Sequence, residues 1–524
     1  MIPLDSPIYD ELETLNGLGY LDTYFEEIKP IARVEAARLT LEAEHNMSVE
    51  EKVDPLAIRL TKVLEEQLSE EVGWLNDNRE DNTPPLMGAV DRVETQYVFS
   101  RGVRRFWRGT SDNDTVENTP LMQNADGIPT ASGSNEIVRA SGWIGAGNFL
   151  TLQGEGAIAG PVTRQVYGQD RAIPIEAESI VSLGNSAISF GLEEKRWGEG
   201  YFAPLSQGAN AQTFPALTWQ NVHPKYLPSF LRYLGPGRRQ VFFGQLDPYR
   251  PYAQHPWTFG HILVFKPLPW FQFGWERVVM FGGRNNDHYD FNGFLERAFG
   301  LSTNSGQTHN RAGLFLRITA PRRFRGVQIY QEILGEDNLY TQVPGIGRFL
   351  PFLAVSYQGG IFLPRLTEDG LTDARFEYSL IEPVYSTHNN GLYSVYQNQT
   401  MGDPIGPNST QINLNFDRWV DLRYRLGAGV FYTEQAPQYD NNNPYPAYFY
   451  GSPITKARSV GGSLDMLRLS QHVPFLDDTL GTVRGQVAVE YAKNVNYAPD
   501  VNSVRVLINL SVSLNPQKPV FQLQ

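Results

Sequence analysis

Cysteine is absent from the 524 residues of this chain. Its absence excludes a disulfide framework, thiolate metal ligands and a cysteine nucleophile. Long apolar runs are also missing: no run approaches the roughly 18 to 20 residues that a transmembrane helix needs, and the mean hydropathy is -0.35. A helical membrane protein is therefore excluded, whereas a membrane β-barrel is not, because barrel strands alternate apolar and polar residues.

Positive charge is also scarce, since 44 Lys and Arg stand against 57 Asp and Glu, which gives a net charge of -13. This balance argues against nonspecific binding to nucleic acid, which needs a basic face. The opening residues lack the basic and apolar regions of a signal peptide. We therefore interpret the chain as a mature or re-engineered form of an exported protein.

Signatures of catalysis and metal binding are missing as well. There is no Gly-x-Ser-x-Gly and no His-Glu-x-x-His, and the eight histidines are scattered. Asp287 and Asp290 could hold calcium through oxygen ligands, but an ordinary polar loop is the favoured interpretation. We expect no enzyme activity, no cofactor and no metal site.

The N-terminal part has the pattern of amphipathic helices. Ser6 can cap a helix that starts at Pro7 and stops near Gly19, a second apolar-periodic stretch covers 34–44, and Asp54 can cap a third. We expect a small bundle that covers one end of the remaining structure. A plug or a docking bundle is the alternative.

From about Asp91 to the C-terminus the period becomes two, as in β-strands. Val93 and Tyr97 share one face, with Arg92 and Glu94 on the other. The same alternation recurs at 310–320, 420–432, 483–491 and 504–514. These segments match the roughly 9 to 11 residues of a tilted membrane-spanning strand. Clusters of Pro, Asn, Asp and Gly between them, at 112–133, 284–293, 403–408 and 435–446, are typical of surface loops.

The polar faces of these strands carry large side chains of both charges, which suits a wide polar lumen. The residues that we expect to face such a lumen are Arg311, Arg317, Arg423, Arg425, Arg484 and Glu490, together with Glu94, Glu377, Asp421 and Arg505. The alternative is that these charged side chains lie on the solvent-exposed faces of soluble β-sheets.

Several blocks occur in an order that resembles the Wzi family of capsule-assembly proteins. They include 6–15, 33–39, Trp197-Gly-Glu-Gly, Phe243-Gly-Gln-Leu-Asp, Phe281-Gly-Gly-Arg and 402–408. The resemblance spans nearly the whole chain. It implies an all-β outer-membrane barrel of about eighteen antiparallel strands, at 89–524, after a periplasmic α-helical bundle at 1–88.

The resemblance also implies a function: a lectin-like, non-catalytic protein that helps to attach or assemble capsular or exopolysaccharide. The expected partners are this polysaccharide, outer-membrane lipids including lipopolysaccharide, and the polysaccharide export machinery, with no nucleic acid and with the chain as a monomer. A transport barrel that passes polysaccharide or small solutes is the main alternative. A barrel enzyme that modifies glycans or lipids ranks last.

Polysaccharide binding needs planar aromatic faces and, for acidic sugars, arginine forks. Three segments combine both, and they give the candidate residues Arg196, Trp197 and Tyr201; Arg232, Arg238 and Arg239; and Tyr249, Arg250 and Trp257. Aromatic and arginine side chains also form the girdles at membrane interfaces. For any single aromatic residue, the girdle is the favoured interpretation.

Overall fold

The computed structural model describes residues 1–76, 86–107, 115–117, 119–147, 149–160, 172–246, 253–286, 290–298, 308–336, 341–343, 347–349, 355–381, 394–397, 399–435, 455–476 and 478–523. Its main body is a closed antiparallel barrel of eighteen long strands, and it is preceded by a few helices. The predicted fold class is thereby confirmed.

Each long strand pairs with the next one along the chain. In order, they are β2 (Leu86–Arg101), β5 (Gly133–Ala146), β6 (Leu150–Gly160), β7 (Ala172–Leu183), β8 (Ser186–Leu192), β10 (Pro215–Asn221), β12 (Pro236–Gln245), β13 (Trp257–Leu268), β14 (Phe271–Phe281), β15 (Thr308–Thr319), β16 (Gln328–Glu336), β19 (Val355–Leu363), β20 (Thr372–Ile381), β23 (Ser409–Val420), β24 (Tyr424–Gln435), β25 (Ala457–His472), β26 (Thr479–Lys493) and β27 (Ser503–Pro516). The barrel closes where β27 pairs with β2, from Val93 opposite Leu514 to Arg101 opposite Val506.

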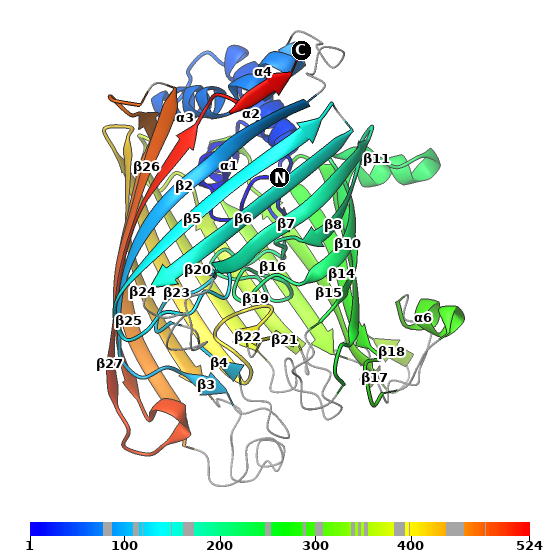
Figure 1. Cartoon of the computed structure of the whole chain (residues 1–524), viewed down its shortest axis with the longest axis vertical. Coiled ribbons are helices and arrows are strands. Elements are labelled where there is room, and N and C mark those ends of the chain that lie inside the picture. Colours follow the sequence, from blue (N-terminus) through cyan, green and yellow to red (C-terminus); the bar gives the residue numbers. More distant parts are fainter. Residues whose placement is uncertain are drawn as a thin grey trace.

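The two ends of the barrel differ in their connections. At the end that carries most of the helices, at the top of Figure 1, most turns are short, for example 184–185, 269–270 and 421–423, and the longer connection 222–235 is an exception. At the opposite end the connections are long, as in 193–214 and 382–408. We call these the helical end and the loop end.

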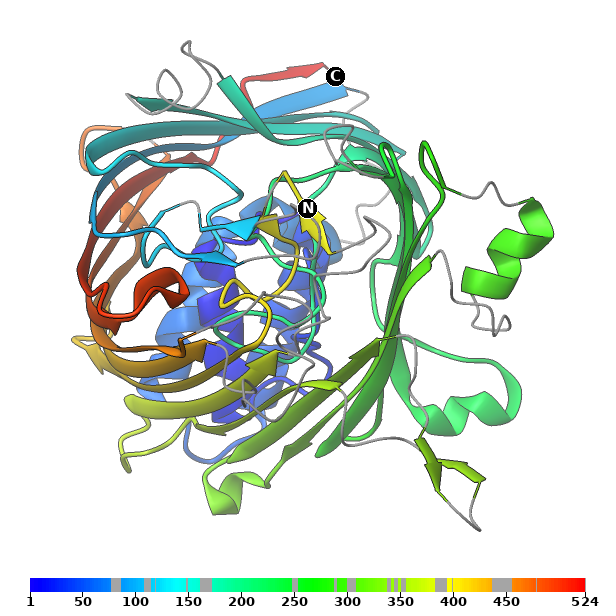
Figure 2. The ribbon, with the colours of Figure 1, turned by 90° about the horizontal axis from the view of Figure 1, so that it is seen from below.

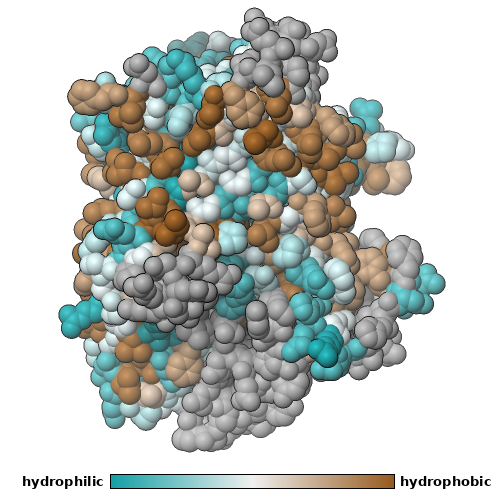
Figure 3. All heavy atoms as spheres, viewed as in Figure 1, coloured by the Kyte–Doolittle hydropathy of each residue, from teal (hydrophilic) through white to brown (hydrophobic). Residues whose placement is uncertain are grey.

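The strands turn their apolar side chains outward and their polar side chains inward. In β2, Val93 and Tyr97 are exposed on the outer wall, whereas Arg92, Glu94 and Gln96 are buried inside. The outer positions of other strands are similarly apolar, as with Ile158, Phe190 and Leu464, and Figure 3 shows apolar residues gathered on the wall nearer the helical end. A soluble barrel has the reverse arrangement, so this wall is typical of a membrane barrel.

The N-terminal helices begin with α1 (Pro7–Leu18), where the predicted signals operate. The Ile8 N–H donates to Ser6 Oγ at 3.4 Å, and Gly19, at φ 85°, ends the helix in a left-handed conformation that glycine adopts without a steric penalty. The next helices are α2 (Arg33–Ser48), α3 (Pro55–Gln67) and the unpredicted α4 (Ser69–Asn76). None of the described helices has the length and apolar character required to span a membrane.

Helix α1 lies inside the lumen, and α2, α3 and α4 lie at its mouth (Figures 1 and 2). Leu12 and Leu15 of α1 pack with Leu60 of α3 in a buried cluster that also includes Trp419 and Leu469 from the barrel. The bundle therefore does more than cover the barrel end, because its first helix enters the barrel.

Candidate functional site: a plugged lumen with a polar chamber

Helix α1 and the residues before it are joined to the lumen wall by ion pairs. Asp10 lies 3.2 Å from Arg425 of β24 and 2.7 Å from Arg484 of β26. On the other side of the closure, Asp5 lies 2.6 Å from Arg92 of β2. These carboxylates connect the N-terminal segment to strands on both sides of the seam between β27 and β2.

Two carboxylates of this segment, Asp5 and Glu13, have strongly lowered pKa values. Burial alone would raise the pKa of Asp5, but the Arg92 and Arg139 guanidiniums overcome this effect and lower it to about 2. Burial also opposes ionisation of Glu13, yet Lys29, whose ammonium lies 2.7 Å away, lowers the pKa of Glu13 to about 2. Both groups are ionised at neutral pH, so the pairs persist there.

A second set of contacts holds the following residues against the far wall. Arg317 of β15 lies 2.7 Å from both Glu26 and Glu199. The short strand β1 (Ile28–Lys29) pairs with β9 (Arg196–Trp197), which belongs to the connection after β8. The N-terminal segment and connection 193–214 are thus packed together inside the barrel.

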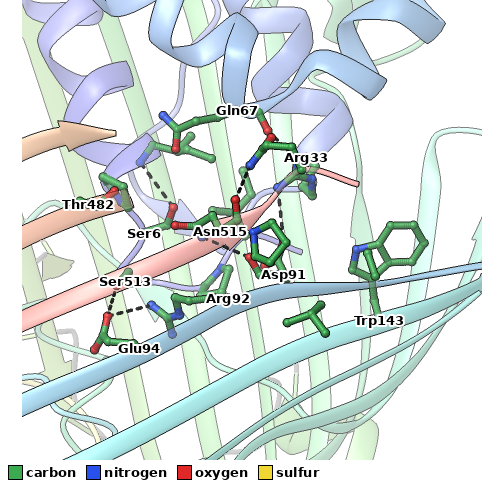
Figure 4. A pocket seen from close by; sticks show the side chains of 18 of the residues that line it. Ser6, Arg33, Gln67, Asp91, Arg92, Glu94, Trp143, Thr482, Ser513 and Asn515 are labelled. Atoms are coloured by element: carbon green, nitrogen blue, oxygen red, sulfur yellow. Dashed lines mark hydrogen bonds and ion pairs between the residues drawn. The ribbon is translucent and has the colours of Figure 1, made fainter. Parts of the chain in front are cut away.

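The helical end is fastened where α2 and α4 meet the seam, as Figure 4 shows. Arg33 of α2 lies 2.6 Å from Glu71 of α4 and 3.5 Å from Asp91 of β2. Asp54, predicted as a helix cap, makes no side-chain capping bond, because its carboxylate accepts from Arg322 at 2.8 Å in the turn after β15. The helices are therefore held by charged residues of the barrel turns as well as by packing.

At the loop end, three long connections fold inward and meet. The Asp126 N–H donates to the Ala209 carbonyl, and the Gly208 N–H donates to the Met401 carbonyl, both at 2.7 Å. Asp126 also lies 2.7 Å from Arg139 of β5. These contacts bring the described parts of connections 102–132 and 382–408 together with connection 193–214 within the lumen.

A polar chamber of about 550 Å³ remains between α1 and these connections. On one side it is lined by Tyr201, Arg196 and Lys29, and on the other by a row from β23. That row consists of Gln411, Asn413, Asn415 and Asp417. Strands β24 and β25 separate it from a second polar group on β2, β26 and β27, which consists of Gln96, Gln486, Asn509 and Ser511. Amides and hydroxyls can both donate and accept hydrogen bonds, which suits polyhydroxylated ligands.

The first predicted sugar-binding group is divided between packing and the chamber. Trp197 is fully buried and its indole N–H donates to Gln240, so it offers no ring face to a sugar. Arg196 donates to the Tyr201 carbonyl at 3.2 Å and thereby holds the backbone of its own loop. The Tyr201 ring lies 3.7 Å from the Arg375 guanidinium and lines the chamber.

The second group is dispersed at the helical end. Arg232 is exposed on the short helix η2 (Ser229–Leu234). Arg238 points inward, is buried and donates to the Ile28 carbonyl at 3.2 Å. Arg239, its neighbour on β12, points outward and lies over the Trp219 ring. Alternation along β12 separates the two arginines, so they cannot act as one fork.

In the third group, Trp257 lies on the outer wall at the loop end and stacks on Phe243, with ring centroids 4.9 Å apart. Tyr249 and Arg250 lie outside the described residues. The possible calcium ligand Asp287 lies outside them too, and Asp290 accepts from the Gly293 N–H at 2.8 Å at the start of a helix. Within the described ranges, no group of three or more His, Asp or Glu residues could hold a metal ion.

The predicted lumen residues have different locations. Arg311, Arg317 and Glu490 are buried on the inner wall, and Arg425 and Arg484 contact α1 there. Arg423 and Asp421 are exceptions, because both are exposed in the turn 421–423 and neither faces the lumen. The alternation that placed Arg423 on a strand breaks at Asp421 and Leu422, whose positive φ values of 51° and 52° reverse the chain before β24 begins.

Sequence reasoning missed the residues that now define the site. Asp5, Asp10 and Glu26 carry no pattern that distinguishes them from other carboxylates of the N-terminal part. The polar row of β23 had a usable signal, since Gln411, Asn413, Asn415 and Asp417 recur at every second position. Such a row predicts one continuous polar face on a strand.

The fold and the lumen define a plugged eighteen-strand antiparallel β-barrel of the outer-membrane type. The family model for the capsule assembly protein Wzi matches residues 103–504. This match covers more than half of the chain, and the chain therefore belongs to the Wzi family. No curated protein sequence matches it.

Solved structures provide a second comparison. Wzi from Escherichia coli is described as an outer membrane protein involved in group 1 capsule assembly and a carbohydrate-binding β-barrel. It matches with a TM-score of 0.65 at 16% identity, over 99% of both chains. OprD from Pseudomonas aeruginosa matches with a TM-score of 0.44 at 10% identity, over 83% of this chain and 96% of its own. OccD3 from the same organism matches with a TM-score of 0.43 at 9% identity, over 81% of this chain and 91% of its own.

Proposed function

We propose that this chain is an outer-membrane protein that binds capsular or exopolysaccharide and helps its attachment or assembly at the cell surface, without catalysis. Membership of the Wzi family supports the link to capsule assembly. The similarity to Escherichia coli Wzi, described as carbohydrate-binding, supports the link to a polysaccharide.

The observation that carries the proposal is the combination of a plug and a polar chamber. Ion pairs from Asp10 and Asp5 hold the N-terminal segment across the helical end of the lumen. The chamber beyond it is lined by amides, hydroxyls and the Tyr201 ring. A polar space that ends at a firmly held helix suits retention of a sugar chain better than its passage, so binding is favoured over the transport alternative.

The proposed orientation of the barrel in the membrane follows from the lengths of the connections at its two ends. Outer-membrane barrels have short turns on the periplasmic side and longer loops outside the cell. By this rule the helical end faces the periplasm and the loop end faces the exterior. Helices α2, α3 and α4 then face the periplasm, and the loop end meets the assembled capsule.

The experiment that tests the proposal is co-sedimentation of the purified barrel, in lipid vesicles, with the native capsule of the same strain. We expect saturable binding that weakens about tenfold, or about 1.4 kcal/mol, in Tyr201→Ala. The matched control is Tyr97→Ala, which removes the same ring from the outer wall and should bind like the unaltered protein. Absence of binding by the unaltered protein would exclude the function, and equal binding by both variants would exclude the chamber as its site.

A further inference from the structure

A second cavity lies outside the barrel, at the loop end. The helix α6 (Phe291–Ala298) lies beside the outer wall, away from the lumen (Figures 1 and 2). The cavity associated with it has a volume of about 840 Å³, within the range of small-molecule sites. Its lining is mainly apolar and comes from outward positions of β10, β12, β13 and β14 together with α6: Leu217, Phe243, Trp257, Phe259, Phe281 and Phe294.

The aromatic rings are fixed around this cavity by contacts with one another. Phe294 of α6 stands edge-on to Phe243, with centroids 5.8 Å apart, and edge-on to Phe259 at 5.5 Å. It also lies 5.5 Å from Phe281, while Trp257 stacks on Phe243. Edge-to-face and offset-stacked pairs of this kind are favourable arrangements. The helix is thereby held to the wall while the cavity remains open.

The polar residues of the cavity come from the loops at the end of the barrel. Arg284, His255, Asn285 and Asp290 are exposed there, Gln254 is half-buried, and all five line the cavity. The Arg284 backbone N–H donates to the Gln254 carbonyl at 2.7 Å, which fixes the backbone at this point. Among the residues that the structure describes, no carboxylate forms an ion pair with the Arg284 guanidinium. The cavity thus combines an apolar wall with a polar end that holds the Arg284 guanidinium and the Asp290 carboxylate.

We infer that this cavity binds the lipid A portion of lipopolysaccharide, with an acyl chain against the aromatic rings and a phosphate on Arg284. The apolar lining opens on the wall that faces membrane lipid, which excludes a free hydrophilic sugar from most of its surface. An arginine at the head-group level binds phosphate through charge-assisted hydrogen bonds. The assignment rests on the proposed function, because only the proposed orientation places the loop end in the outer leaflet.

The test is native mass spectrometry of the full-length protein after delipidation and incubation with purified hexa-acylated lipid A. We expect one lipid A to remain bound at activation energies that remove phosphatidylethanolamine. Phe294→Ala should reduce the retained fraction at least tenfold. Because this residue lies on the outer helix, thermal unfolding should stay close to that of the unaltered protein, which separates loss of the site from loss of the fold.

A second variant tests the charged end of the site. Arg284→Ala should weaken retention of bisphosphorylated lipid A about tenfold and leave that of dephosphorylated lipid A unchanged. Two outer-wall residues away from the cavity provide the controls, Trp275→Ala for an aromatic ring and Arg239→Ala for an arginine. Both should retain lipid A like the unaltered protein.

Three results would overturn the inference: equal retention of phosphatidylethanolamine, equal retention of lipid A by Phe294→Ala, or loss of capsule binding in Phe294→Ala with lipid A retained. Capsule co-sedimentation on the same preparations distinguishes the two proposals. If lipid A is not retained while capsule binding is normal, only this inference fails. If lipid A is retained and capsule is not bound, the proposed function fails.

Discussion

The inner and outer faces of the same strands follow opposite rules. On the inner face, charged side chains are buried and paired, as Arg92 is with Asp5 and Arg317 with Glu199. On the outer face, aliphatic side chains such as Leu464 and Ile158 are exposed without a protein partner to cover them. The difference teaches that inner arginines are paired with carboxylates of the N-terminal segment and of the inward-folded connections, whereas outer aliphatic side chains face the surrounding medium.

The largest effect is expected where one inner guanidinium serves several carboxylates. Arg317→Met should lower the free energy of unfolding by about 3 to 5 kcal/mol, because it leaves Glu26 and Glu199 buried without their cation. Burial already raises the pKa of Glu199, so the loss should shrink as the pH falls and the carboxylates become protonated. Denaturant titration of the purified barrel in vesicles measures it.

The matched control is Arg239→Met, on the outer face of β12. Its side chain lies over the Trp219 ring, and in the part of the chain that the structure describes no buried carboxylate pairs with it. The loss of folding free energy should therefore stay below about 1 kcal/mol. Similar losses in both variants would mean that the inner and outer arginines are equivalent, which contradicts the comparison.

The outer wall is tested by an introduced charge. Leu464→Arg, near the middle of β25, should destabilise the protein by about 2 to 4 kcal/mol in a bilayer, because a lipid-facing charge is costly at that depth. The adjacent Ser463 lines the chamber and donates to Asp465 at 3.0 Å. Ser463→Arg should therefore cost less, and a greater loss there than at Leu464 would reverse the assignment of the two faces.

The ion pairs that Asp5 and Glu13 of the N-terminal segment form inside the barrel should be lost in acid. The pKa values of Asp5 and Glu13 are about 2 in the folded protein, below their ordinary values of 3.8 and 4.5. Their stabilisation is therefore complete above about pH 4.5 and is lost as the pH falls toward 2, with Glu13 contributing on the order of 2 kcal/mol. Protease sensitivity of the N-terminal segment should rise over that range.

The control for acid release is Asp5→Asn, which removes one of the two titrating groups. This variant should be more protease-sensitive at neutral pH and should change less on acidification. A pH response identical to that of the unaltered protein would show that Asp5 does not hold the segment.

The smallest effect is expected in the polar row of the chamber. Replacing Gln411 and Asn413 together by Ala should weaken capsule binding about tenfold, or about 1.4 kcal/mol, since both side chains line the chamber. Ile412→Ala, between them, alters the outer wall and should leave affinity unchanged. Co-sedimentation isotherms in vesicles compare the two, and a reversed order would place the sugar elsewhere.

Local sequence signals predicted the local structure well. Ser6, Pro7 and Gly19 located α1, and alternation located β2 and β15, because caps, turns and strand periods depend on neighbouring residues. Family resemblance supplied the strand number, which alternation alone could not give.

The site itself could not be read from the sequence, because its contacts join distant positions. Asp10 and Arg425 are 415 residues apart, and no local pattern pairs them. Trp197 illustrates the converse problem, since an aromatic residue beside an arginine suggests a sugar platform, yet the pairing of β9 with β1 buries it. Arg423 shows how an unrecognised turn interrupts an alternation that is continuous in the amino-acid sequence.

Conductance of the purified full-length barrel in planar bilayers tests the central claim that the lumen retains a polysaccharide and does not conduct solutes. With Asp10 paired to Arg425 and Arg484, we expect no stable large channels at neutral pH, and channels should appear when Asp10→Ala releases α1. Stable large channels from the unaltered protein would contradict the account and favour a transport barrel.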